Sequence, residues 1–94
     1  PALPDTPPIS DTVPGFELVT WYALVAPAGT PAAIINRLHA EASKVMRDAD
    51  IQKRFGEQGL EPTVMSPAEL KRYTENDTAR WSKLIKAANI RASL

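Results

Sequence analysis

The chain lacks several features that define whole classes of protein. It contains no cysteine, which excludes a disulfide framework, a thiolate metal site and a cysteine nucleophile. Eleven Lys and Arg balance eleven Asp and Glu, so the chain lacks the positive charge that nucleic-acid binding requires. Its longest apolar stretch, residues 18–26, is about half of the ~20 residues that a membrane-spanning helix needs. We therefore expect no nucleic-acid partner and no membrane-spanning helix.

The distribution of proline and charge divides the chain. Ninety-four residues allow one small domain. Residues 1–31 contain seven of the nine prolines and no basic residue, whereas all Lys and Arg lie beyond them. The opening segment PALPDTPPISDTVPGFE is rich in residues that favour extended or turning backbone. We expect residues 1–17 to form an extended connection and residues 18–94 to form the folded part.

Two segments resemble β-strands. Residues 18–26, LVTWYALVA, are rich in β-branched and aromatic residues and are followed by Pro27. Alternate positions are apolar on both faces, a pattern typical of a strand that is covered on both sides in a layered α/β sheet. Residues 60–65 favour a short strand, and Pro62 places it at a sheet edge because proline cannot donate to a ladder.

Three helices are expected after the first strand. Thr30 is placed to cap the first helix and Pro31 to occupy its first position. Asp48 is a capping residue for the second helix, which Gly59 should end. The run SPAE at 66–69 has the serine, proline and glutamate of a capping box, and it predicts the start of the third helix.

Two of these helices have a face that should be buried. The apolar residues of the first helix repeat at helical spacing and are Ile34, Ile35, Leu38, Ala42, Val45 and Met46. The stripe on the third helix includes Leu70, Tyr73, Trp81, Leu84, Ile85 and Ala88, and only Asp77 interrupts it. Each of these helices therefore requires a packing partner.

The predicted elements do not complete a fold. A strand that is apolar on both faces needs neighbouring strands and two covering layers, yet the chain supplies only one other, weaker strand. The missing cover has to come from residues outside this chain or from a second copy, as a homo-oligomer or a strand-exchanged dimer. We expect the chain to be part of a longer α/β protein.

A series of motifs, in order, connects the chain to a known family. They are ALPDTP (2–7), PGFE (14–17), TWYALVAPAGTP (20–31), GLEP (59–62), SPAEL (66–70) and ARWSKLIKAANI (79–90). In this order they resemble the C-terminal part of the substrate-binding receptors of tripartite tricarboxylate transporters, often called Bug receptors. The resemblance covers essentially the whole chain.

The resemblance implies a fold, a location and partners. It implies a periplasmic receptor with a two-lobe periplasmic-binding-protein-like α/β fold, which binds a small carboxylated solute for membrane transporter subunits. Residues 1–17 would leave the second lobe, and residues 18–26 would be a hinge strand entering the first. The rest of 18–94 would be the C-terminal helical part of that lobe. The main ligand-holding loops would precede this chain, which alone would not bind the solute.

Three aromatic residues are the candidates for substrate binding. Phe16, Trp21 and Tyr22 are suited to the wall of a small-molecule cleft, and equally to a buried core. The resemblance places the cleft near Phe16. The start of the first helix at Gly29 to Pro31 is explained by helix capping alone.

No group of residues indicates catalysis. His39 is the only histidine and no nucleophile is arranged beside it in the sequence, while the acidic pairs fall at polar helix ends. We assign no catalytic residue, no metal and no cofactor, and we expect the protein not to be an enzyme. The alternative to a receptor is a helical protein–protein interaction module without a small-molecule ligand.

Overall fold

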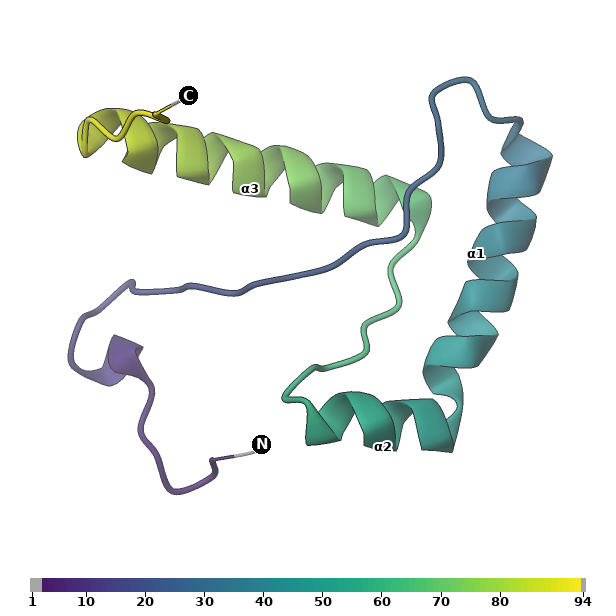
Figure 1. The fold of residues 1–94 in the computed structure, drawn as a ribbon, viewed down its shortest axis with the longest axis horizontal. Coiled ribbons are helices and arrows are strands. Elements are labelled where there is room, and N and C mark those ends of the chain that lie inside the picture. Colours follow the sequence, from purple (N-terminus) through teal and green to yellow (C-terminus); the bar gives the residue numbers. More distant parts are fainter. Residues whose placement is uncertain (1–2, 94) are drawn as a thin grey trace. The chain divides into compact units, whose positions relative to one another are not determined.

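The computed structural model describes residues 3–93 and contains four helical elements. A short 3₁₀ helix, η1, spans Ile9–Asp11, and three α-helices follow: α1 (Ala32–Arg47), α2 (Ala49–Glu57) and α3 (Pro67–Ala87) (Figure 1). The chain divides into two compact units, Pro1–Pro62 and Thr63–Leu94. The first unit therefore holds η1, α1 and α2, and the second holds α3.

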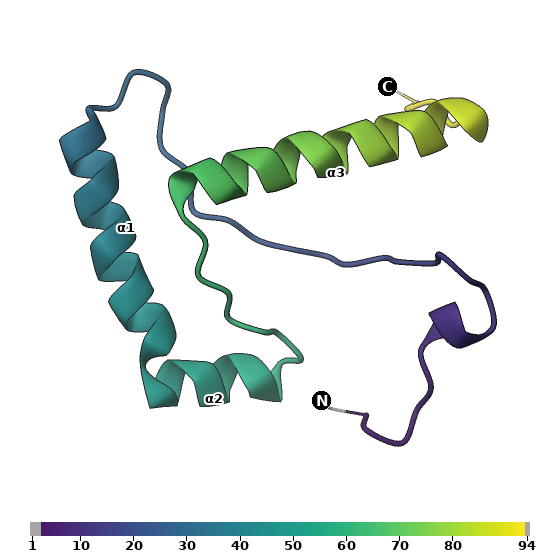
Figure 2. The same cartoon turned by 180° about the vertical axis from the view of Figure 1, so that it is seen from behind.

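The expected α/β fold is wrong for this chain. Residues 3–93 contain no strand and no sheet, so neither the hinge strand at 18–26 nor the edge strand at 60–65 is present. Figures 1 and 2 show residues 18–26 as a stretch of chain without helix or strand between η1 and α1. The physical reason is that a strand exists only through ladder hydrogen bonds to another strand, and residues 3–93 contain no other strand.

The expected cover of residues 18–26 is absent as well. The side chains of Tyr22, Leu24 and Val25 are 75–81% exposed, and only Trp21 and Ala26 in this segment are half-buried. β-Branched and aromatic composition indicates which environment suits a segment, and it does not provide that environment.

Helix α1 begins one residue later than the sequence pattern suggested. The Pro31 carbonyl accepts hydrogen bonds from the amides of Ile34 (3.0 Å) and Ile35 (3.2 Å), so Pro31 is the N-cap and not the first helical residue. The N-cap position therefore has no side-chain cap, and the Thr30 hydroxyl donates to the Pro27 carbonyl at 2.7 Å. Thr30, which was expected to cap α1, therefore stabilises the turn before the helix.

Helix α2 begins and ends at the residues that the sequence predicted. An Asp48 carboxylate oxygen accepts from the amides of Asp50 (2.9 Å) and Ile51 (3.2 Å). At the other end Gly59 has a positive φ of 75°. The Leu60 amide then donates to the carbonyl of Phe55 at 2.9 Å, which closes a Schellman motif.

Helix α3 has the predicted capping box. The Glu69 amide donates to the Ser66 hydroxyl (3.1 Å), and the Ser66 amide donates to the Glu69 carboxylate (2.9 Å). The helix ends where Asn89 takes a positive φ of 53° and the Ile90 amide donates to the Ile85 carbonyl at 3.1 Å. Both ends of α3 are therefore fixed by hydrogen bonds within a few residues.

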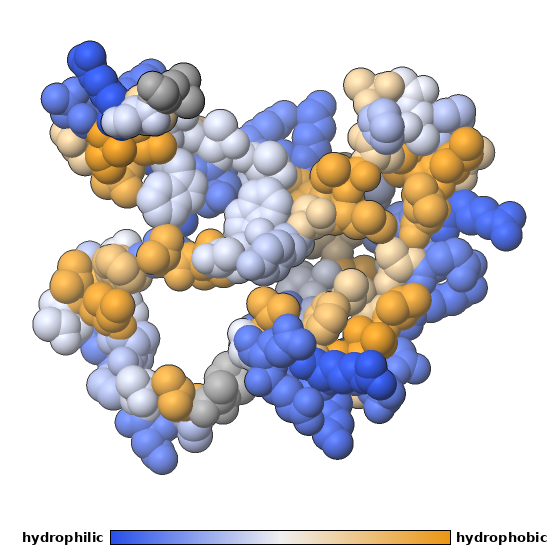
Figure 3. All heavy atoms as spheres, viewed as in Figure 1, coloured by the Kyte–Doolittle hydropathy of each residue, from blue (hydrophilic) through white to orange (hydrophobic). Residues whose placement is uncertain are grey.

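No apolar core forms in the described part of the chain. None of the hydrophobic side chains in 3–93 is buried, and Ser43 is the only buried residue. Large apolar side chains reach the surface, as the orange atoms in Figure 3 show. The described residues thus leave many large apolar side chains exposed.

Candidate functional site

The three aromatic candidates lie in the segment between η1 and α1. Phe16 follows a turn in which its amide donates to the Val13 carbonyl at 3.1 Å, and Gly15 takes the positive φ of 81° that this turn needs. The Phe16 side chain is 42% exposed, Trp21 is half-buried and Tyr22 is 81% exposed. The three residues were expected to line one cleft, but their side chains differ in how much of each is buried.

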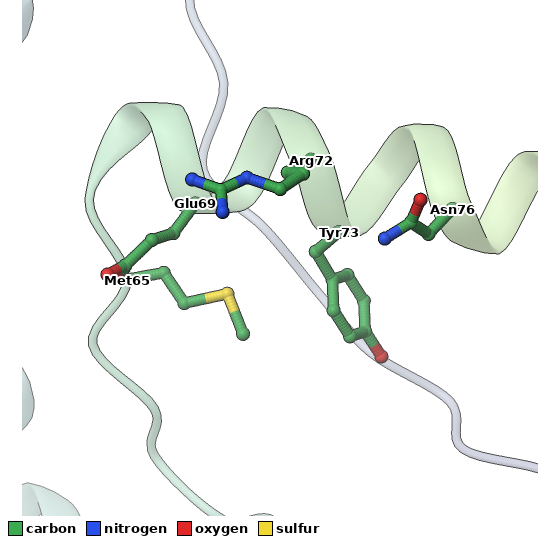
Figure 4. A pocket seen from close by; sticks show the side chains of 5 residues that line it. All are labelled: Met65, Glu69, Arg72, Tyr73 and Asn76. Carbon is green, nitrogen blue, oxygen red and sulfur yellow. The ribbon is translucent and has the colours of Figure 1, made fainter.

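A hollow of about 290 Å³ lies on α3, away from the predicted candidates. It is lined by Met65, Glu69, Arg72, Tyr73 and Asn76 (Figure 4). Four of these residues project from α3, and Met65 comes just before its cap. In Figure 4 the Arg72 side chain extends back along the helix toward Glu69. The hollow is thus formed by one side of one helix and the residue that leads into it.

The chemistry of this hollow does not match a carboxylate site. Arg72 and Asn76 supply donors, but the Glu69 carboxylate beside them already accepts from the Ser66 amide and repels a second anion. A single helix also cannot enclose most of a small molecule, as binding pockets do. Sequence analysis did not single out these residues. Their spacing of three, four and seven places them on one helix face, but spacing alone does not predict a hollow.

Asp77, the acidic residue within the apolar stripe of α3, lies beside a basic residue. The Asp77 side chain is only 18% exposed, and its carboxylate oxygen lies 3.5 Å from an Arg80 guanidinium nitrogen. The Arg80 guanidinium in turn lies 5.4 Å from the centre of the Trp81 ring, within the range of a cation–π contact. These contacts explain why an acidic residue is tolerated among apolar ones.

The remaining sequence candidates have structural roles. Gly29 takes a positive φ of 84° in the turn before α1, and the Thr30 hydroxyl is used within that turn. His39 is half-buried on α1, where its carbonyl accepts from the Ser43 hydroxyl at 2.6 Å. Asp48 caps α2, and Asp50 lies 3.6 Å from Arg54 one turn along the same helix.

Residues 3–93 contain neither a metal-binding group nor a membrane-spanning helix. No three or more histidine, cysteine or acidic residues in that part of the chain are grouped so as to hold a metal ion. None of its helices has both the length and the apolar character that crossing a membrane requires.

A family model matches almost the whole chain. Residues 1–90 match the model described as "Tripartite tricarboxylate transporter family receptor". The match includes the aromatic candidates, residues 18–26 and the helices α1, α2 and α3. No solved structure matches the chain.

Curated relatives cover the same region. The chain is 36% identical over 87 residues to a Pseudomonas protein encoded in the tcbD–tcbE intergenic region. The aligned residues make up 90% of this chain and 26% of that protein. It is 28% identical over 87 residues to a Pseudomonas knackmussii protein from the clcB–clcD intergenic region, covering 90% of the chain and 52% of the relative. Protein BugT of Bordetella pertussis is 25% identical over 73 residues, with coverage of 78% and 22%. The chain thus spans between about a fifth and a half of these relatives.

Proposed function

Because this chain belongs to the tripartite tricarboxylate transporter receptor family, we propose that it is part of an extracytoplasmic receptor that binds a small carboxylated solute. The observation that carries the proposal is the family match over residues 1–90. The receptor works in the periplasm and delivers its solute to the membrane subunits of the transporter. The match favours this function over a helical interaction module without a ligand.

The chain alone does not bind the solute in this proposal. It spans about a quarter of the length of the Pseudomonas relative from the tcbD–tcbE region. The hollow on α3 is open, is built by one helix face and contains an acidic group. A carboxylate site needs several donors that converge from different segments, and we assign those donors to the rest of the receptor. Residues 18–94 form the C-terminal part of the receptor, and residues 1–17 connect it to what precedes.

Phe16, Trp21 and Tyr22 supply apolar contacts near the solute in the complete receptor. Support comes from their exposure, because Phe16 and Tyr22 leave large aromatic surfaces accessible on a stretch of backbone without helix or strand. Aromatic rings provide contact area while costing little conformational entropy. In this role they shape the cleft, and the charge of the solute is held elsewhere.

The test is calorimetric titration with dicarboxylates, tricarboxylates and acidic amino acids. The same solutes are titrated into the 94-residue chain and into the full-length Pseudomonas relative. We expect the full-length relative to bind at least one of them and the chain to bind none more tightly than about 1 mM, the range of weak association.

The two possible failures are distinguishable. Tight binding of a solute by the 94-residue chain would contradict the assignment of the carboxylate donors to other parts of the receptor. Failure of the full-length relative to bind any carboxylated solute would contradict the ligand class.

A further inference from the structure

We propose that the end of α3 is a docking surface for an acidic segment of a protein partner. We define the α3 cationic end as Lys83, Lys86 and Arg91. The inference rests on the proposed function, which gives the receptor a membrane-subunit partner. It adds to that function the surface that makes the contact and the charge of the segment that binds there.

Charge is unevenly distributed along the chain. All eleven acidic residues lie at or before Asp77. Residues 78–94 contain four basic residues and no acidic one, which gives them a formal charge of +4. Residues 1–77 contain seven basic and eleven acidic residues, which gives them a formal charge of −4. The neutral chain therefore has a cationic end, and a surface of one charge favours a partner of the opposite charge.

Lys83 and Lys86 have no acidic neighbour along their own helix. Ion pairs on a helix surface join residues three or four positions apart, and residues 79–90 contain no acidic residue. Both lysines are exposed. By contrast, the Lys44 ammonium on α1 lies 3.3 Å from the Glu41 carboxylate. The charges of Lys83 and Lys86 are therefore available to the carboxylates of a partner.

The two lysines lie on the side of α3 opposite its apolar stripe. At about 100° per residue, Lys83 lies about 160° and Lys86 about 140° around the helix from Trp81, which belongs to that stripe. The two lysines are thus about 60° apart around the helix, and about 4.5 Å apart along its axis. A layer that covers the apolar stripe leaves this pair of charges accessible.

The helix dipole explains only part of this charge. It stabilises a cation in the last turn of a helix, where Lys86 lies. Lys83 precedes that turn, and Arg91 follows the C-cap at Ala88. Arg80 is left out of the α3 cationic end, because its guanidinium already contacts a carboxylate and an aromatic ring. Two exposed cations are therefore left without a role in ending the helix.

The number and position of the charges favour a peptide over a lipid surface. Basic clusters that bind anionic lipids contain about four to eight Lys and Arg, and a helix on a membrane turns its apolar face to the lipid. Lys83 and Lys86 lie opposite the apolar stripe of α3. Carboxylates at alternate positions of an extended peptide are about 7 Å apart, a spacing that two long, flexible lysine side chains match. We therefore assign an acidic peptide segment as the occupant.

The first test titrates an acidic peptide into the 94-residue chain and follows the amide NMR signals of the chain. The probe is a decapeptide of alternating Glu and Ser, and a decapeptide of alternating Gln and Ser is the uncharged control. At low salt we expect the acidic decapeptide alone to shift signals, mainly at residues 80–91. The shifts should vanish in 1 M NaCl, where charges are screened beyond about 3 Å. Absence of shifts, or shifts mainly in α1 and α2, would overturn the proposal.

Two double variants separate local charge from total charge. Lys83→Gln/Lys86→Gln removes two exposed charges from the α3 cationic end, and Lys44→Gln/Arg54→Gln removes two exposed charges from α1 and α2. We expect the first to weaken binding of the acidic decapeptide about fivefold and the second less than about twofold. Equal weakening would contradict the proposal, because total charge would then account for the binding. Circular dichroism should show that both variants retain the helices.

Vesicles of phosphatidylglycerol and phosphatidylethanolamine test the lipid alternative. We expect the chain not to sediment with them under the conditions in which it binds the acidic decapeptide. Sedimentation that Lys83→Gln/Lys86→Gln abolishes, without binding of the peptide, would replace the peptide by a lipid surface. No small solute is present in these measurements. Their failure is therefore distinguishable from failure of the proposed function, which the solute titrations test.

Discussion

The start of α3 and the segment at 18–26 were both read from clear sequence patterns, and only the first is present in the structure. The capping box of Ser66 and Glu69 has both of its hydrogen bonds, 2.9 and 3.1 Å long. Residues 18–26 have the composition of a buried strand and form no strand in the described chain. The two regions differ in where their partners come from.

The difference concerns the distance over which a structure is stabilised. A helix cap needs groups three residues apart, so a short stretch of sequence contains the whole interaction. A strand needs a neighbour whose position depends on the rest of the fold. The cap is therefore present in the structure, whereas the pattern at 18–26 requires a neighbouring strand that residues 3–93 do not contain.

Proline substitutions should show this difference most strongly. Ala79→Pro in the middle of α3 removes a helical hydrogen bond and introduces a clash, at a cost of about 3 kcal/mol or more. We expect much of the circular dichroism signal of α3 to be lost. Ala23→Pro should leave the helical signal of the isolated chain unchanged, because residues 18–26 form no strand whose ladder could break. A comparable loss from Ala23→Pro would show that this segment supports the helices.

The Schellman ending of α2 should give the next largest effect. Gly59 has a φ of +75°, a region that costs a residue with a Cβ about 1–2 kcal/mol. Gly59→Ala should therefore weaken the last turn of α2, measured as faster amide hydrogen exchange at Leu60. Gly56→Ala is the matched control, because Gly56 lies inside α2 without a positive φ and alanine there should slow exchange. Equal effects at the two positions would rule out backbone conformation as the cause.

Removal of the capping hydroxyl should give a smaller change. Ser66→Ala loses the bond from the Glu69 amide, at a cost of about 1 kcal/mol of helix stability. Ser82→Ala, at an exposed position inside the same helix, should instead raise the helical content slightly. The helical content of both variants is measured by circular dichroism. The cap would have no role if Ser66→Ala also raised the helical content.

The smallest effect should come from the exposed ion pair on α2. Asp50 and Arg54 are 3.6 Å apart with side chains more than 70% exposed. Such i,i+4 pairs contribute about 0.3–0.5 kcal/mol, which salt reduces. Asp50→Asn should therefore lower the helical content slightly at low salt and have no effect in 1 M NaCl. An effect that did not change with salt would exclude the ion pair as its origin.

Sequence reasoning predicted the locally determined parts of the fold. It found the three α-helices, the Asp48 cap, the Gly59 ending and the capping box, each of which depends on residues within one or two turns. It placed the start of α1 one residue early, because it took Thr30 as the cap. In the structure Pro31 is the N-cap and the Thr30 hydroxyl donates to the Pro27 carbonyl. It was wrong about both strands and the α/β class, since a sheet depends on strand neighbours that the described residues do not form.

The candidate site was less predictable than the fold. Phe16, Trp21 and Tyr22 were chosen because they are aromatic, and residue type does not determine how much of each side chain is buried. The hollow around Arg72 and Tyr73 was missed, since it depends on how neighbouring side chains extend from α3. The family was identified correctly because ordered motifs are a property of the sequence itself.

The central claim is that these 94 residues cannot cover their own apolar surface, and scanning calorimetry of the isolated chain tests it most directly. A globular domain of this length unfolds with an enthalpy of about 65 kcal/mol near 60 °C. At concentrations where light scattering reports a monomer, we predict no cooperative transition approaching that size. A monomer that unfolds in a single transition of about 65 kcal/mol would contradict the claim.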